Sequence, residues 1–116
     1  MRWVVAYQSH ALVIPNARGL LLAWGTRTAD KLLIAITNSD PAIVCGFDVA
    51  ESQTGIDGGT DGFVTWEAGI FHNLGPLERR RWAIDLDGQQ FCALYGSTYG
   101  GGSINGLITV LLGYTL

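Results

Sequence analysis

Charged residues are scarce in this 116-residue sequence, and lysine is almost absent. Lys and Arg together number 7 and Asp and Glu number 10, so charged side chains make up 15% of the chain, and Lys31 is the sole lysine. A net charge of -3 leaves no broad cationic surface for phosphate backbones, so nucleic acid is not an expected partner. The 48% of hydrophobic residues also argues against a disordered chain.

Long hydrophobic runs are absent as well. The longest, residues 20–24 and 107–112, fall far short of the roughly 20 residues that span a bilayer. The N-terminal stretch 1–5 passes into polar residues 8–10, which leaves too short an apolar core for a signal peptide. We therefore expect a protein that is made in a cytosol and is not embedded in a membrane.

Cysteine is limited to Cys45 and Cys92, which lie far apart in apolar, strand-like runs. The sequence has no CxxC motif and no Cys/His pair at zinc-ligand spacing. Because nothing indicates export, both residues are expected to carry buried thiols and to form no disulfide. The cysteines thus predict neither a metal site nor a disulfide bond.

Short segments rich in Val, Ile, Leu, Thr and aromatic residues are what the chain does contain. Sixteen glycines and three prolines separate these segments, and their apolar residues do not repeat with a helical period. The pattern predicts an all-β fold: a single-domain antiparallel β-sandwich over residues 1–116, jelly-roll-like, with about eight strands. The predicted strands are 2–7, 10–15, 19–24, 31–37, 42–48, 63–71, 79–86, 90–96 and 105–115.

The clearest alternation of apolar and polar residues lies in 79–86. It places Trp82, Ile84 and Leu86 on one face, which we expect to point into the core. The turn signal Asp87-Gly88 predicts a hairpin that joins this strand to the next one.

Two segments, 32–36 and 108–112, are apolar on both faces, which is typical of central strands covered on both sides. With a mean hydropathy of +0.26 and few charges, their outward side chains would form an exposed patch in an isolated domain. We therefore expect the chain to form a homo-oligomer. A trimer is preferred, although no residue fixes the number.

A catalytic or metal-binding constellation is not recognisable. His10 and His72 are the only histidines, and no serine lies in a GxSxG motif. The segment 57–62 resembles a calcium loop but has Gly59 and Ala68 where carboxylate ligands would stand. We predict no enzyme and no catalytic, cofactor-binding or metal-binding residue. A small jelly-roll enzyme stays a distant alternative, since the acidic residues offer no way to select a catalytic pair.

The one basic cluster is Arg79, Arg80 and Arg81. In a strand Arg79 and Arg81 share one face and Arg80 takes the other. The cluster is read either as a solvated strand edge or as a possible contact with an acidic partner.

The aromatic residues leave a second alternative open. Trp3, Trp24, Trp66 and Trp82 are expected in the core or in an interface, yet exposed members could stack on sugars. Together with region 51–73, they support a carbohydrate-binding or host-recognition module as the alternative function.

The order of short segments in 31–116 resembles that of small β-sandwich accessory proteins of tailed-phage virions. A strand ends at Asn38, a Ser/Pro turn follows, the next strand closes on Gly46, and a loop carries Gly55. Further along come Leu74-Gly75-Pro76-Leu77, Ala93-Leu94-Tyr95-Gly96, a glycine-rich turn and an apolar last strand. The chain departs from that pattern in the insertion 56–73 and in lacking a Pro-Gly step before the Trp82 strand.

The resemblance implies a viral structural role. Such bacteriophage proteins decorate or cement capsids, or form small tail parts, as homo-oligomers without catalysis or cofactors. For this chain it implies a virion protein assembled in the host cytoplasm, with itself and the major capsid protein or another virion protein as partners. It transfers no binding residue to a position in this sequence.

Overall fold

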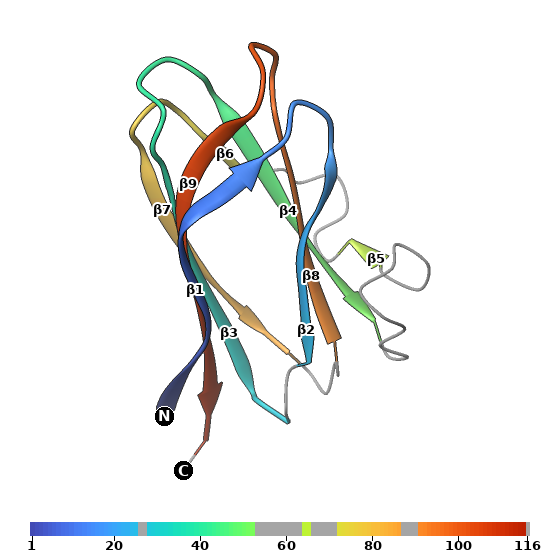
Figure 1. Cartoon of the computed structure of the whole chain (residues 1–116). Helices are drawn as coiled ribbons and strands as arrows, with labels where there is room; N and C mark the ends of the chain where they lie inside the picture. The colour runs from blue at the N-terminus through green and yellow to red at the C-terminus, as the bar shows by residue number, and fades with distance from the viewer. Residues whose placement is uncertain (26–27, 53–63, 66–71, 87–90, 116) are drawn as a thin grey trace.

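The computed structural model describes residues 1–25, 28–52, 64–65, 72–86 and 91–115, which form antiparallel β-strands and no helix (Figure 1). No helix able to cross a membrane occurs among these residues. The strands are β1 (Arg2–Ile14), β2 (Gly19–Gly25), β3 (Lys31–Asn38), β4 (Cys45–Ser52), β5 (Val64–Thr65), β6 (His72–Leu74), β7 (Arg79–Asp85), β8 (Phe91–Thr98) and β9 (Ile104–Tyr114).

The described strands form two sheets that pack face to face (Figure 1). Sheet A has the order β1-β9-β3-β7, and sheet B has the order β2-β8-β4-β5, with β6 also paired to β4. The chain crosses between the sheets at every step from β1 to β4 and again from β6 to β9. This alternation is that of a jelly roll. The predicted all-β sandwich is confirmed.

The core lies between the sheets and is filled by alternate side chains of the central strands. Along β3, buried and half-buried residues alternate without exception. Leu32, Ile34 and Ile36 are fully buried, and their ladder partners on β9 are also buried. The two segments predicted to be central strands are therefore central, because β3 and β9 occupy the middle of sheet A.

Several predicted strand boundaries were wrong. Segments 2–7 and 10–15 form one strand, since the register shifts after Val5 and after Ser9 bend β1 without ending it. The strand predicted to start at residue 42 begins at Cys45. The Asp40 carboxylate accepts hydrogen bonds from the backbone amides of residues 42 and 43, and these bonds hold that segment in a turn. Of the predicted strand 63–71, only β5 lies within the described residues.

The predicted hairpin between the Trp82 strand and its successor was also wrong. Strand β7 pairs with β3 in sheet A, whereas β8 pairs with β2 and β4 in sheet B. The turn residues Asp87 and Gly88 themselves lie outside the described residues. Leu86 is fully buried as predicted, but Ile84 is only partly buried because β7 is the edge of sheet A. The Trp82 side chain lies outside the description.

The turn before β7 contains leucine in a backbone conformation that usually needs glycine. The Glu78 amide donates to the Gly75 carbonyl at 3.1 Å, and Leu77 within this turn has φ 58°. A left-handed leucine costs about 1–2 kcal/mol. This turn occupies the place of the missing Pro-Gly step and leaves Leu77 64% exposed.

Candidate functional site

The outward side of sheet B is covered. Tyr95 and Ala93 point away from the main core and form a separate buried cluster, and the outward Asp48 is only 5% exposed. Arg18 lies over these residues. Its Nε and Nη2 donate to the two Asp48 carboxylate oxygens at 3.2 and 2.5 Å, and its guanidinium stacks 4.3 Å from the centre of the Tyr95 ring.

The pKa shifts in this cluster arise from burial and from contacts among its own residues. The hydrogen bond to Asp48 raises the pKa of Arg18, and burial raises the pKa of Tyr95. The guanidinium of Arg18 and the carboxylate of Asp48 therefore form a salt bridge on the outward side of sheet B.

The outward side of sheet A is open instead. We define the outer face of sheet A by the outward residues of its four strands, which are half-buried or exposed: Trp3, Val5, Gln8, Val13, Lys31, Leu33, Ala35, Thr37, Arg79, Arg81, Ala83, Asp85, Asn105, Leu107, Thr109 and Leu111. Its central strands β3 and β9 contribute apolar and threonine side chains, apart from Lys31 at the start of β3 and Asn105 at the start of β9. Lys31 forms an ion pair with Asp85 at 3.2 Å near one end. The middle of this face thus carries no charged side chain.

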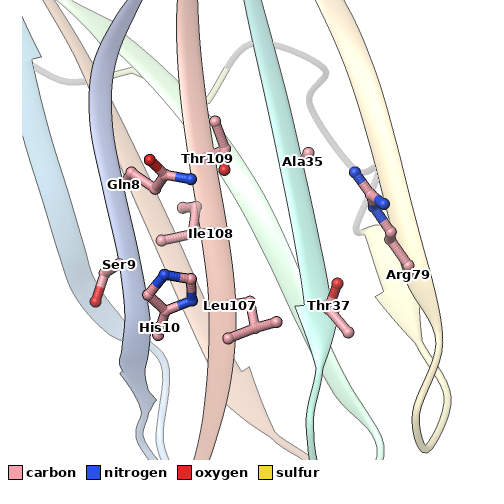
Figure 2. A pocket seen from close by; sticks show the side chains of 9 residues that line it. All are labelled: Gln8, Ser9, His10, Ala35, Thr37, Arg79, Leu107, Ile108 and Thr109. Atoms are coloured by element: carbon pink, nitrogen blue, oxygen red, sulfur yellow. The ribbon is translucent and has the colours of Figure 1, made fainter.

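A hollow of about 200 Å³ lies on this face (Figure 2). His10 of β1 and Arg79 of β7 stand at opposite margins, and Leu107 and Thr37 lie between them (Figure 2). The complete lining is Gln8, Ser9, His10, Ala35, Thr37, Arg79, Leu107, Ile108 and Thr109. Four strands that are distant in sequence supply it. Its lining includes no Trp, Tyr or Phe side chain.

The hollow does not assemble a hydrolytic triad from the described residues. Ser9 Oγ, beside His10, accepts a hydrogen bond from the Ala11 amide at 3.1 Å. No hydrogen bond joins His10 to a carboxylate or hydroxyl of the described chain. Among the same residues no group of three or more His, Cys, Asp or Glu could hold a metal. The His72 side chain and the loop 57–62 lie outside the description.

The three arginines divide between the two sides of β7 as predicted. Arg79 and Arg81 are opposite Thr37 and Ala35 of β3, so they belong to the outer face of sheet A. Arg80 lies on the other side and forms an ion pair with Glu78 at 3.2 Å. Within the described chain, neither Arg79 nor Arg81 forms a salt bridge, so two exposed cations border the open face.

Comparisons with known proteins include a likeness to a solved viral structure. No family model matches the sequence, and no curated protein matches it. The chain is similar to a protein chain in "Structure of infectious bursal disease virus Gx strain". The TM-score is 0.45 and the sequence identity is 13%, and the match covers 96% of this chain and 31% of the viral chain. This virus is not a tailed phage, so the likeness to tailed-phage proteins stays a prediction.

Among the described side chains, the exposed aromatic residues do not gather into one platform. Trp3 is 41% exposed, but its ring lies on the sheet, where a Cβ on Gly113 would meet Cζ3 at 2.8 Å. Tyr99 is 58% exposed at the other end of β9 and donates a hydrogen bond to Asn73 Oδ1. The side chains of the three other tryptophans lie outside the description.

Neither cysteine forms a disulfide, as predicted, and both thiols are buried. Burial raises the pKa of the Cys45 thiol to about 11, with a further contribution from Glu78. At pH 8, about one Cys45 thiol in a thousand is then ionised. We expect the native protein to react slowly with a chromogenic disulfide reagent and the guanidinium-unfolded protein to release two equivalents at once. Two equivalents released equally fast by the native protein would contradict this burial.

Proposed function

We propose that this chain is a virion structural protein, a capsid decoration or cement protein that docks on a capsid or tail surface and self-associates. The observation that carries the proposal is the difference between the outer faces of the two sheets. Sheet B is covered at Ala93, Tyr95 and Asp48, whereas the outer face of sheet A is open and carries no charged side chain in its middle. Such a face is typical of a protein that works against other subunits.

Burying this face supplies a driving force for docking. Standard interfaces cover about 800 Å² on each partner, and apolar burial contributes about 25 cal/mol per Å². The gross gain exceeds the roughly 4–15 kcal/mol that association costs in lost freedom and ordering. A sheet face needs no rearrangement to contact a flat surface, so little of the gain is lost.

The charges at the margin favour an acidic docking partner. Arg79 and Arg81 project from β7 without a salt bridge to any described residue, although the chain as a whole has a net charge of -3. Guanidinium groups form bidentate hydrogen bonds with carboxylates. The partner in this proposal is therefore the major capsid protein or another virion protein that presents acidic side chains. Nucleic acid and membrane are not partners in it, and the protein reaches the virion in the host cytoplasm.

Substitution of Arg79 and Arg81 tests the proposal. We expect the chain to co-sediment with particles assembled from the virion proteins encoded beside it. Replacing Arg79 and Arg81 together by glutamine should weaken this binding about tenfold, which corresponds to about 1.4 kcal/mol. Arg80→Gln is the matched control, since Arg80 lies on the other side of the same strand and should leave binding unchanged. Failure of the wild-type chain to sediment with the particles would contradict the proposal.

A second candidate is a carbohydrate-binding or host-recognition module, which the polar rim of the hollow favours. Gln8, His10 and Arg79 could donate hydrogen bonds to sugar hydroxyl or carboxylate groups. Selective binding on a glycan array that disappears in Gln8→Ala would favour this candidate over docking. A distant third candidate, a small enzyme, would need turnover that is lost in His10→Ala.

A further inference from the structure

We infer that two copies of this chain join edge to edge through β1, antiparallel across a two-fold axis, so that their A sheets become one continuous sheet. This inference rests on the self-association in the proposed function and names the surface that performs it. The segment at its centre is Trp3–Tyr7.

The first observation is that β1 is an edge strand that charged side chains do not protect. Among the described strands it pairs with β9 alone, so its other backbone edge has no ladder partner. Natural edge strands avoid such pairing with lysine, proline or charged side chains. Between Trp3 and Ile14, β1 contains no lysine, arginine, proline or carboxylate, although register shifts follow Val5 and Ser9. The opposite edge of the same sheet, β7, carries three arginines and Asp85.

The second observation is that β1 is apolar and exposed on both faces near its start. Trp3 and Val5 lie on the outer face and are 41% and 55% exposed, respectively. Val4 and Tyr7 lie on the other face, opposite buried residues of β9, and are still 39% and 38% exposed. A strand with apolar residues on both faces is typical of the interior of a sheet. A neighbouring strand would complete that environment.

The partner that fits this edge is a second copy. A two-fold axis brings identical surfaces together, and antiparallel β1 strands would meet without like charges because Arg2 of each copy lies at the far end of the pair. A ring with a head-to-tail contact would instead place β1 against a different edge of the next copy. The other edge of sheet A is β7, whose arginines would lose water in that contact. The two-fold pair therefore replaces the expected trimer.

The side of the sandwich is large enough for a stable dimer. Strand β2, the edge of sheet B, contacts β1, and its Leu20 is 40% exposed. The molecule is 41 Å long, and the smaller of its other two dimensions is 22 Å. A side of that length and depth offers the roughly 800 Å² per partner that a standard interface covers. The register shift after Val5 limits the regular part of the pairing, so contacts from side chains such as Leu20 contribute as well.

The experiment combines hydrogen exchange with an edge variant. In the wild-type protein, amides of residues 3–7 should exchange more slowly at high than at low protein concentration, because pairing protects them. Val5→Lys should weaken the dimer at least about tenfold in sedimentation velocity. Leu77→Lys is the matched control, since Leu77 is 64% exposed and lies far from β1, and it should dimerise like the wild type.

The possible outcomes separate this inference from the proposed function. A wild-type trimer, a Val5→Lys dimer of unchanged strength, or exchange at residues 3–7 that does not depend on concentration would overturn β1 pairing alone. A monomeric wild-type chain would overturn both β1 pairing and self-association. If Val5→Lys fails to fold, the wild-type exchange measurement decides the question by itself.

Discussion

Ile34→Asp is expected to unfold the domain. Ile34 is fully buried on the central strand β3, and its β9 ladder partner Val110 is fully buried too. A carboxylate there would lose its hydration without gaining a cation, a cost comparable to the roughly 5–15 kcal/mol of stability that a domain has. Circular dichroism should show no cooperative melting transition at any temperature.

The neighbouring residue provides the control for this prediction. Leu33 belongs to the same strand but lies on the outer face of sheet A, where it is only half-buried. Leu33→Asp should therefore fold and melt cooperatively. A cooperatively melting Ile34→Asp protein would show that the register of β3 is wrong.

Asn38→Leu is expected to destabilise the domain by about 3 kcal/mol. The Asn38 side chain is fully buried at the end of β3, and it joins two loops. Its Nδ2 donates to the Ile43 carbonyl at 2.7 Å and to the Gly75 carbonyl at 3.0 Å, while its Oδ1 accepts from the Asp40 amide at 2.9 Å. Leucine has a similar size but would leave these backbone groups without that partner.

Urea unfolding measures this effect as a change in the free energy of unfolding. Ser39→Ala is the control, because Ser39 is the exposed next residue in the same turn and should change stability by less than about 0.5 kcal/mol. An Asn38→Leu protein as stable as the Ser39→Ala protein would contradict the role given to the amide.

The strands could be predicted from the sequence where the signal is local. Apolar residues on both faces of 32–36 and 108–112 correctly predicted central strands. These segments have a strand on each edge, and their inward side chains fill the core. The turn signal at 87–88 led to the wrong prediction of a hairpin, because a local turn motif does not show whether the chain crosses to the other sheet. The role of Asn38 was missed for a similar reason: an asparagine before a proline-containing turn reads as a turn residue.

The candidate site was predictable only in part. The alternation along β7 correctly placed Arg79 and Arg81 on one side and Arg80 on the other. The hollow was not predictable, since its lining comes from β1, β3, β7 and β9. Likewise, the exposed edge of β1 depends on the order of strands in sheet A, which is set by long-range pairing and leaves no local mark on the sequence.

Sedimentation equilibrium of the wild-type chain over a range of micromolar concentrations tests most directly the claim that this domain is built to be covered by other subunits. The open apolar face of sheet A and the unpaired β1 edge predict a species of at least twice the chain mass of 12.5 kDa, which dissociates on dilution. A single species of 12.5 kDa at every concentration would contradict that claim.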